Sequence, residues 1–291
     1  MQSIRQKGLP MVKKKSKTAP SGHLPVSSTE FLAQTREYLE GHTRTAWKPI
    51  VKKGDGPAAA AKFGGVPWLG ADEEWPACGQ CSHPMHLLVQ FHFDELPAEI
   101  GKQHGTGLFQ FFYCTNDEEW QTSGDSYSDC FLLRTVQPDA SRRKPTVPKF
   151  NDDHPDPFPA KRITGWKEVP DFPCITEFPL LGVKHEVIPG QKTLRLKVVN
   201  ESLGIASEVD YDEFRKLDRC VTGDKLGGWP SWVQVNPEYP DCPDCQLKLQ
   251  SPLFTISYRD NIPYDFADGG RGHVFRCPTH SERFAFPWQC G

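Results

Sequence analysis

Apolar residues recur at helical spacing in one short stretch near the start of the chain. The face that they form consists of Phe31, Leu32, Thr35, Tyr38 and Leu39. Ser27 and Glu30 give the capping-box pattern before this face, and Gly41 follows it as a suitable stop. A second helix is predicted to begin near Asp210, where Glu213 completes a similar pattern before apolar residues.

Short stretches rich in β-branched and aromatic residues predict strands rather than further helices. Residues 193–198 alternate apolar and polar side chains, as a strand with one wet face does. The predicted strands are 86–93, 107–113, 130–136, 193–199, 253–258 and 273–277. The chain also contains 27 prolines, which break helix interiors. We therefore expect few long helices and many short strands joined by loops.

Landmarks in the first half of the chain recur in the second half at an almost constant distance. Each half has Gly-Gly-x-Pro, an aromatic residue before proline, Cys-x-x-Cys and, after a longer interval, Phe-x-Cys. The matched residues, 163 or 164 positions apart, are Gly64 and Gly227, Gly65 and Gly228, Pro67 and Pro230, Trp75 and Tyr239, Cys78 and Cys242, Cys81 and Cys245, Phe112 and Phe275, and Cys114 and Cys277. Self-similarity at a fixed period indicates repeated architecture. The sequence therefore predicts an internal duplication.

The repeat divides the chain into two halves with distinct flanking segments. Residues 1–26 contain no acidic residue and several lysines, and are predicted to be a disordered basic leader. Residues 27–137 form the first half and residues 175–291 the second. Residues 138–174 are dense in Pro, Asp and Lys and are predicted to be a long connection. We expect the halves to be a fused pair related by a pseudo-twofold axis.

The repeated cysteines are candidate metal ligands. Two thiols separated by two residues can reach one ion through a tight turn, and a third from a distant strand extends the tetrahedral set that structural zinc requires. In the second half the set is complete, with Cys242, Cys245, Cys277 and His280. Buried thiols or disulfides are the alternative.

The first half has three matching cysteines and leaves its fourth ligand open. Cys78, Cys81 and Cys114 match the second set, and the position of the histidine is taken by Asp117. Carboxylate is a less common zinc ligand. The residues that could replace it are His83, His86 and His104. The prediction is two structural zinc ions per chain, with Cys130, Cys174, Cys220 and Cys290 free.

Charge and cysteine usage limit the setting in which the protein works. The net charge of -3 gives no general attraction to nucleic acid or anionic membranes. Residues 1–28 lack an apolar core, so no signal peptide is expected, and no stretch reaches the ~20 apolar residues of a membrane span. Cys-x-x-Cys in such a chain favours metal in a reducing compartment. We expect a cytoplasmic protein.

The motifs taken together resemble the YwqG-like family of uncharacterised bacterial proteins. The first half carries this resemblance in Lys62-Phe-Gly-Gly-Val-Pro67, Leu87-Leu-Val-Gln-Phe-His-Phe-Asp-Glu-Leu-Pro97 and Gly107-Leu-Phe-Gln-Phe-Phe-Tyr113. The second half carries it in Lys225-Leu-Gly-Gly-Trp-Pro230, Gln234, Asp268-Gly-Gly270 and Val274-Phe275. The simplest members lack the cysteines, so the chain looks like a zinc-knuckle-bearing branch. The resemblance implies a duplicated α+β fold, mainly antiparallel β with few helices and two zinc knuckles, and it supplies no catalytic residue.

A shorter similarity covers residues 64–114 alone. Pro67-Trp-Leu-Gly70, the following Cys-x-x-Cys with Pro84-Met85, and Phe-x-Cys114 look like the programmed-cell-death-2-type chaperones of a ribosomal protein. This similarity favours a protein-binding role.

The chain has no pattern that joins an acid, a base and a nucleophile. It contains no Gly-x-Ser-x-Gly, no phosphate-binding Gly-x-x-x-x-Gly-Lys-Ser/Thr, no His-Glu-x-x-His and no deaminase arrangement. We therefore expect no catalysis. The rival prediction is a zinc-dependent hydrolase that uses the Cys78, Cys81 and Cys114 site, because catalytic zinc keeps an open position.

The predicted function is a cytoplasmic protein-binding module stabilised by structural zinc. Its partner would be a toxin that it neutralises or a client protein that it escorts, and the toxin option rests on the family resemblance. Four tryptophans near the repeated motifs, Trp68, Trp75, Trp229 and Trp232, suit either an interface or a core. Nucleic-acid binding through the basic leader is a third alternative.

Overall fold

The computed structural model describes residues 22–116, 125–139 and 145–291, and in these ranges it consists of two β-sheets with few helices. Most of the predicted basic leader, residues 1–21, lies outside the described residues. No helix in the described ranges is both long and apolar enough to cross a membrane. The expected α+β class, mainly antiparallel with few helices, is confirmed.

The larger sheet has eleven strands and the smaller has four. The strands of the larger sheet are β2 (Arg44–Lys53), β3 (Lys62–Phe63), β4 (His86–His92), β5 (Leu108–Tyr113), β6 (Phe131–Val136), β7 (Lys161–Asp171), β11 (Lys225–Gly227), β12 (Pro252–Ser257), β13 (Arg271–Arg276), β14 (Phe284–Ala285) and β15 (Trp288–Gln289). Those of the smaller sheet are β1 (Leu24–Pro25), β8 (Val183–Val187), β9 (Arg195–Asn200) and β10 (Ile205–Asp210). The helices are α1 (Ser28–Glu40), α2 (Ala98–His104) and α4 (Tyr211–Arg215), with the 3₁₀ helices η1 (Phe93–Glu95) and η3 (Ile175–Leu181).

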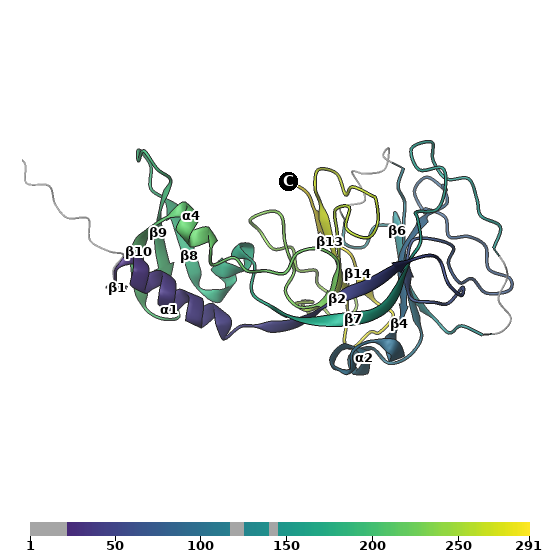
Figure 1. Ribbon diagram of the computed structural model, residues 1–291, viewed down its shortest axis with the longest axis horizontal. Helices are drawn as coiled ribbons and strands as arrows, with labels where there is room; N and C mark the ends of the chain where they lie inside the picture. The colour runs from purple at the N-terminus through teal and green to yellow at the C-terminus, as the bar shows by residue number, and fades with distance from the viewer. Residues whose placement is uncertain (1–21, 117–124, 140–144) are drawn as a thin grey trace, which may run out of the picture.

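The order of the large sheet is symmetric about the pair β2 and β7. These long strands pair antiparallel over their whole length and run together from the small sheet into the large one (Figure 1). On one side lie β3, β4, β5 and β6, and on the other lie β11, β12, β13 and β14. Each motif-bearing half therefore contributes the same series of strands. The internal repeat itself stays a prediction from the sequence.

The large sheet curls until its two end strands meet. β14 contacts β6, and the backbone N–H of Phe286 donates to the carbonyl oxygen of Ser126 at 2.9 Å. The enclosed core is rich in phenylalanine, because strand residues that point inward must bury large apolar area. Phe91 and Phe109 of one half contact Phe254 and Phe284 of the other. The two halves thus share one core, as expected.

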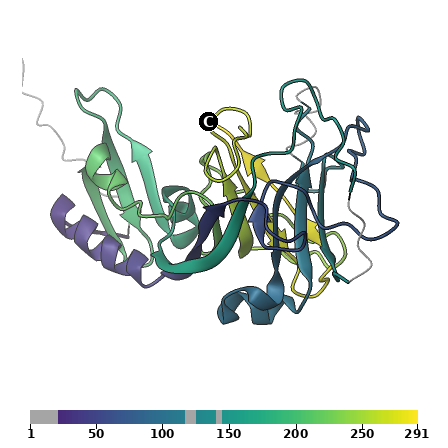
Figure 2. The same cartoon turned by 45° about the vertical axis from the view of Figure 1, so that its right-hand side comes forward.

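The small sheet and α1 form a separate lobe at one end of the molecule (Figure 2). The Ser27 hydroxyl caps α1 by accepting from the backbone N–H of Glu30 at 3.2 Å, as the capping-box pattern predicts. Phe31 and Leu39 of α1 pack into a core with Val198 and Phe214. We call this unit the small lobe. In it, a helix from the first half covers a sheet whose strands β8, β9 and β10 come from the second half. The remaining strand, β1, lies within the predicted leader 1–26, so the end of that segment is ordered and not disordered as expected.

The predicted elements are confirmed, but several strands lie where none was predicted. All six predicted strands and the first helix are present within two residues of their expected ends, and the second helix begins at Tyr211, next to the expected Asp210. The segment 138–174, expected to be a connection, contains the central strand β7. Gly165 and Pro170 weaken its strand pattern, but β2 on one side and β3 on the other supply its hydrogen-bonding partners. Tertiary pairing therefore decides the conformation of this stretch.

Candidate metal centres

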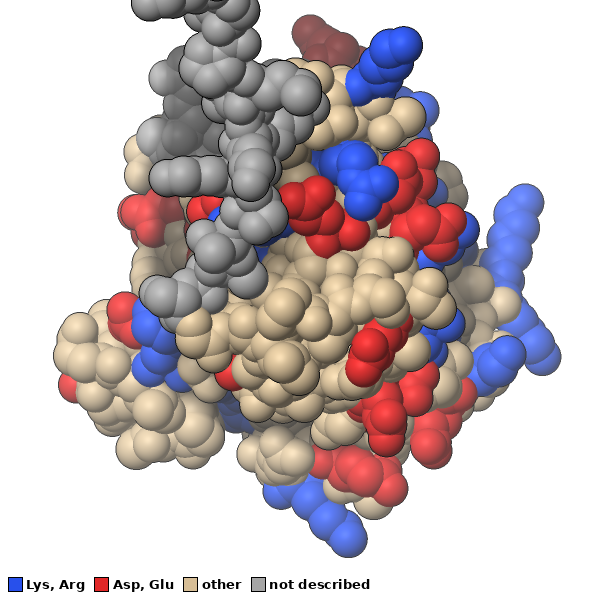
Figure 3. All heavy atoms as spheres, turned by 90° about the vertical axis from the view of Figure 1, so that its left-hand side faces the viewer, with Lys and Arg blue, Asp and Glu red and all other residues tan. Residues whose placement is uncertain are grey.

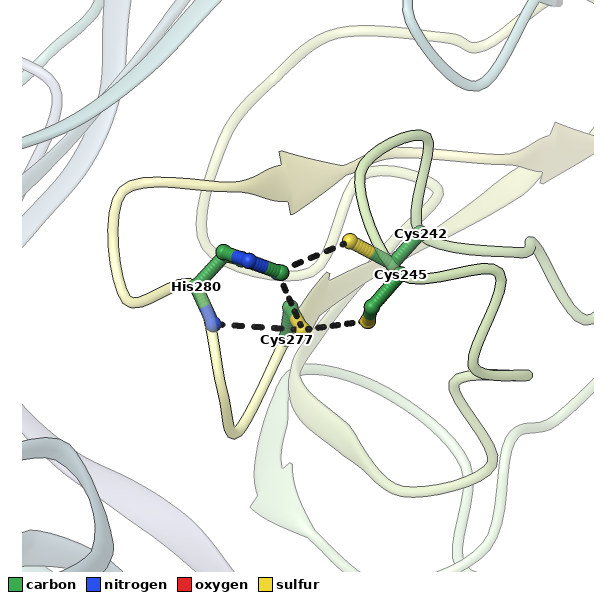
Figure 4. Close-up of side chains that lie close together, drawn as sticks. All are labelled: Cys242, Cys245, Cys277 and His280. Carbon is green, nitrogen blue, oxygen red and sulfur yellow. Dashed lines mark hydrogen bonds between the residues drawn. The ribbon is translucent and has the colours of Figure 1, made fainter.

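The second Cys/His set comes together in the structure as one cluster. Cys242 and Cys245 lie on the turn that follows Pro240, Cys277 directly follows β13, and His280 lies three residues further on (Figure 4). One ligand atom from each of the four residues lies within 4.8 Å of all the others. The four residues can therefore hold a single metal ion.

The spacing of these atoms suits a tetrahedral ion. The Nδ1 atom of His280 lies 3.7 Å from the sulfur of Cys242 and 3.7 Å from that of Cys277. The sulfurs of Cys245 and Cys277 are also 3.7 Å apart. Metal–sulfur bonds of about 2.3 Å and a metal–nitrogen bond of about 2.0 Å place tetrahedral ligands roughly 3.6–3.8 Å from one another. A disulfide requires a sulfur separation of about 2.0 Å, so these thiols are not bridged.

The first set forms a cluster of three cysteines, with its predicted fourth ligand outside the described residues. Cys78, Cys81 and Cys114 come within the same 4.8 Å limit, and the sulfurs of Cys81 and Cys114 are 3.5 Å apart. Asp117 falls in the range 117–124, which the structure does not describe. These three thiols can also hold a metal ion.

The histidines considered as replacements for Asp117 occupy different places. His86 is buried, and its ring nitrogens contact the carbonyl oxygen of Asp156 and the hydroxyl of Thr115. His104 stacks on Phe93 at the end of α2. His83 lies beside Cys81, with its side chain hydrogen-bonded to that residue. Of the three, His83 is the one positioned next to the cluster.

The two Cys-x-x-Cys turns have the same backbone geometry. The backbone N–H of Ser82 donates to the carbonyl oxygen of Cys78 at 2.9 Å, and that of Gln246 donates to Cys242 at 2.8 Å. Ser82 and Gln246 both adopt a left-handed conformation, with φ of 61° and 59°. A left-handed residue after the second cysteine reverses the chain and brings both thiols to one side. The matched sequence positions therefore build matched sites.

Each cluster rests on a small apolar core of its own. Phe112 packs with Cys78 and Cys114 in the first half, and Phe275 packs with Cys242 and Cys277 in the second. Both phenylalanine side chains are fully buried. The Phe-x-Cys motif thus supplies a ligand and, two residues earlier, the side chain that keeps water from one side of the cluster.

The environment favours the thiolate form at one position in each cluster. Burial acts to raise the pKa of Cys81, but hydrogen bonds from the backbone and side chain of His83 outweigh it and lower this pKa to about 7. At Cys277 burial is likewise outweighed by hydrogen bonds from the backbone of His280 and Thr279, and the pKa is lowered. Burial raises the pKa of Cys78. Because metal binds the thiolate form, the lowered pKa values of Cys81 and Cys277 reduce the free energy needed to remove their protons when metal binds.

An ion pair that includes a buried lysine beside each Gly-Gly motif was missed by sequence reasoning. The Nζ of Lys225 lies 2.6 Å from the Asp171 carboxylate, and that of Lys62 lies 2.5 Å from Asp55. The second oxygen of Asp55 accepts from the backbone N–H of Val66, while Asp171 also accepts from that of Trp229. Lys62 and Lys225 are 163 residues apart, so the repeat could have revealed the lysines.

The tryptophans near the motifs belong mainly to the core. Trp68, Trp229 and Trp232 are buried, and Trp75 is half-buried with its indole N–H donating to the carbonyl oxygen of Met85 at 2.8 Å. The core alternative for these residues is therefore the correct one. They carry no argument for an exposed binding surface.

Comparison with protein families gives one match over most of the chain. The model of the family described as a domain of unknown function, DUF1963, matches residues 61–287, more than three quarters of the 291 residues. Both clusters lie within the matched range. Comparison with curated proteins gives no match.

Proposed function

This chain belongs to the DUF1963 family, and we propose that it is a non-catalytic protein-binding module stabilised by two structural zinc ions. The partner is a toxin that the module neutralises or a client that it escorts. Within the family, we assign the chain to a YwqG-like branch that carries zinc knuckles. Its place of action is the cytoplasm.

The ligand set of the second cluster is the observation that carries the proposal. Four protein ligands with tetrahedral spacing fill the coordination sphere of zinc, and leave no position for water or substrate. Two of these ligands, Cys242 and Cys277, are buried in a small apolar core. This arrangement supports a structural ion. The three soft thiolates favour zinc over hard cations such as magnesium.

The surface of the small lobe supports the binding part of the proposal. Exposed large apolar residues of this lobe are Leu24, Leu180, Val187, Leu194 and Leu203. Figure 3 shows this end of the molecule, where uncharged side chains cover the middle and charged ones lie mainly around them. Exposed large apolar side chains are common at protein-binding sites.

A zinc-dependent hydrolase is the second candidate function, and it draws on the first cluster alone. Three thiols converge there among the described residues, so a fourth position held by water would leave an open site. The fully liganded twin of this cluster favours the structural alternative. Nucleic-acid binding through residues 1–26 rests on their lysines only.

The metal proposal predicts close to two zinc ions per chain. Cys242→Ser should reduce the content to about one ion, because three ligands no longer hold zinc tightly. It should also lower Tm by roughly 10 °C, since zinc binding is coupled to folding. Cys290→Ser is the matched control, because this thiol belongs to neither cluster, and should leave both values unchanged. Metal analysis by mass spectrometry that finds no zinc in the wild-type protein would end the proposal.

The partner proposal is tested by affinity capture from the host organism, with the full chain and with a variant lacking residues 1–20. A protein bound in stoichiometric amounts by both forms supports the module. Metal-dependent turnover by protein that captures nothing supports the hydrolase. Capture that falls steeply with salt and disappears without residues 1–20 supports nucleic-acid binding.

A further inference from the structure

Two adjoining hollows form a groove between α2 and the second metal cluster. Their volumes are about 630 Å³ and about 500 Å³. Both are lined by Gln103, His104, Arg276 and Pro278, so Arg276 lies where they meet. Each is within the range of ligand sites in proteins. We call this pair of hollows the α2 groove.

Arg276 is held rigidly in the groove and forms no direct ion pair in the described ranges, although Glu282 interacts with its charge. Its guanidinium lies over the rings of Phe93 and Phe284, and donates to the carbonyl oxygens of His104 at 2.7 Å and Ser281 at 2.6 Å. The arginines that form ion pairs in the described part of the chain are Arg134, Arg219, Arg259 and Arg283. A fixed, half-buried guanidinium with no carboxylate in direct contact is suited to an anionic ligand.

A second arginine faces the same groove from its far end. Arg44 lines the smaller hollow, and its guanidinium lies 3.5 Å from the centre of the Trp229 ring. Its contacts are the carbonyl oxygens of Gly228 and Gln250, at 3.4 and 3.3 Å. Glu177 and Asp171 interact with its charge, but neither forms a direct ion pair with it among the described residues. Glu99 and Glu282 also line the hollows, one on each.

Apolar surface lies on both sides of Arg276. Trp47 and Ile100 line the smaller hollow, while Leu133 and Phe284 line the larger one. An inorganic anion would fill only a fraction of this space. A chain that alternates acidic and apolar side chains would match the alternation of cations and apolar surface.

We propose that the α2 groove binds an acidic peptide segment of a partner protein, with a carboxylate on Arg276 and flanking apolar side chains in the two hollows. The guanidinium fork accommodates a carboxylate through two parallel hydrogen bonds. This assignment rests on the proposed binding function and identifies the chemistry of the partner. It is distinct from the exposed surface of the small lobe.

The test measures binding of a fluorescein-labelled peptide with alternating Leu and Glu residues, against the same peptide with Gln in place of Glu. The Glu peptide should bind at least about tenfold more tightly, and Arg276→Gln should abolish the difference. Gln103 is exposed and lines both hollows, so its replacement should leave the fold intact. Gln103→Lys should tighten binding of the Glu peptide and Gln103→Glu should weaken it. Gln191→Lys, in the small lobe, is the matched control and should change nothing.

Equal binding of both peptides, or a Glu peptide insensitive to both Gln103 variants, overturns the proposal. Citrate that displaces the Glu peptide at concentrations similar to the Kd of that peptide also overturns the proposal. The groove would then be a pocket for small anions. If a captured partner binds the Arg276→Gln variant as well as the wild type, the α2 groove is not its binding site. The proposed protein-binding function then still stands. If the Glu peptide binds but affinity capture finds no partner, the peptide site in the α2 groove still stands and the proposed protein-binding function fails.

Discussion

A fully buried pair of charged side chains lies beside the Gly-Gly motif of the second half. Asp171 and Lys225 have fully buried side chains 2.6 Å apart. Asp171 also accepts from the backbone N–H groups of Val221 and Trp229, at 2.7 and 2.8 Å. Such a pair is costly to break, because the remaining partner is left charged and without water. The carboxylate therefore fixes the turn between β11 and the second metal cluster.

The two halves offer a matched comparison for this ion pair. Asp171→Ala should lower the free energy of unfolding by about 3–5 kcal/mol, because it leaves Lys225 buried and unpaired. Asp55→Ala should lower the free energy of unfolding by clearly less, because Asp55 is 40% exposed and water can take the place of its carboxylate oxygens. Urea unfolding of both variants measures the difference. If both variants lose the same free energy of unfolding, burial of the carboxylate does not determine the strength of these ion pairs.

Residue identity alone predicted the ligands but not their surroundings. Cys242, Cys245, Cys277 and His280 were recognisable because a metal site imposes short, regular spacing along the chain. Arg44 and Arg276 carried no such pattern among the 34 lysines and arginines. Arg276 lies on β13 and meets α2 through the carbonyl oxygen of His104, whereas Arg44 meets Trp229 because β2 pairs with β11.

Elements with local signals were predictable from the sequence. α1 has a cap, a periodic apolar face and a glycine stop, and it forms where expected. The predicted strands include β4, β5, β12 and β13, which are short and rich in aromatic or β-branched residues. These four are the strands that flank the metal clusters in the two halves.

Elements whose conformation depends on distant partners were not predictable. β2 and β7 contain Pro49, Gly165 and Pro170, which argue against strands when read locally. In the structure they pair with each other across more than a hundred residues of sequence. In addition, β2 pairs with β11 of the second half and β7 pairs with β3 of the first half. Because β7 lies in the predicted connection, the join between halves is part of the centre of the fold.

At the scale of the whole molecule there are two main cores, connected by β2 and β7. The large sheet encloses the phenylalanine-rich core, and each half carries one candidate metal cluster. The core of the small lobe is separate, and it contains no residue from either cluster. Contacts that hold the small lobe together are thus distinct from those that hold the metal sites.

This separation predicts that the small lobe can be destabilised without disturbing the metal sites. Phe31 is fully buried between α1 and the small sheet, so Phe31→Ala should cost about 3–5 kcal/mol within that lobe. Amide hydrogen exchange should then accelerate in β9 and β10 but stay slow in β5 and β13, because local unfolding follows the cooperative units of a structure. Zinc content should remain at the wild-type value. Exchange that accelerates equally in all four strands would show that the two cores unfold as one unit, and that β2 and β7 couple the small lobe to the metal-bearing sheet.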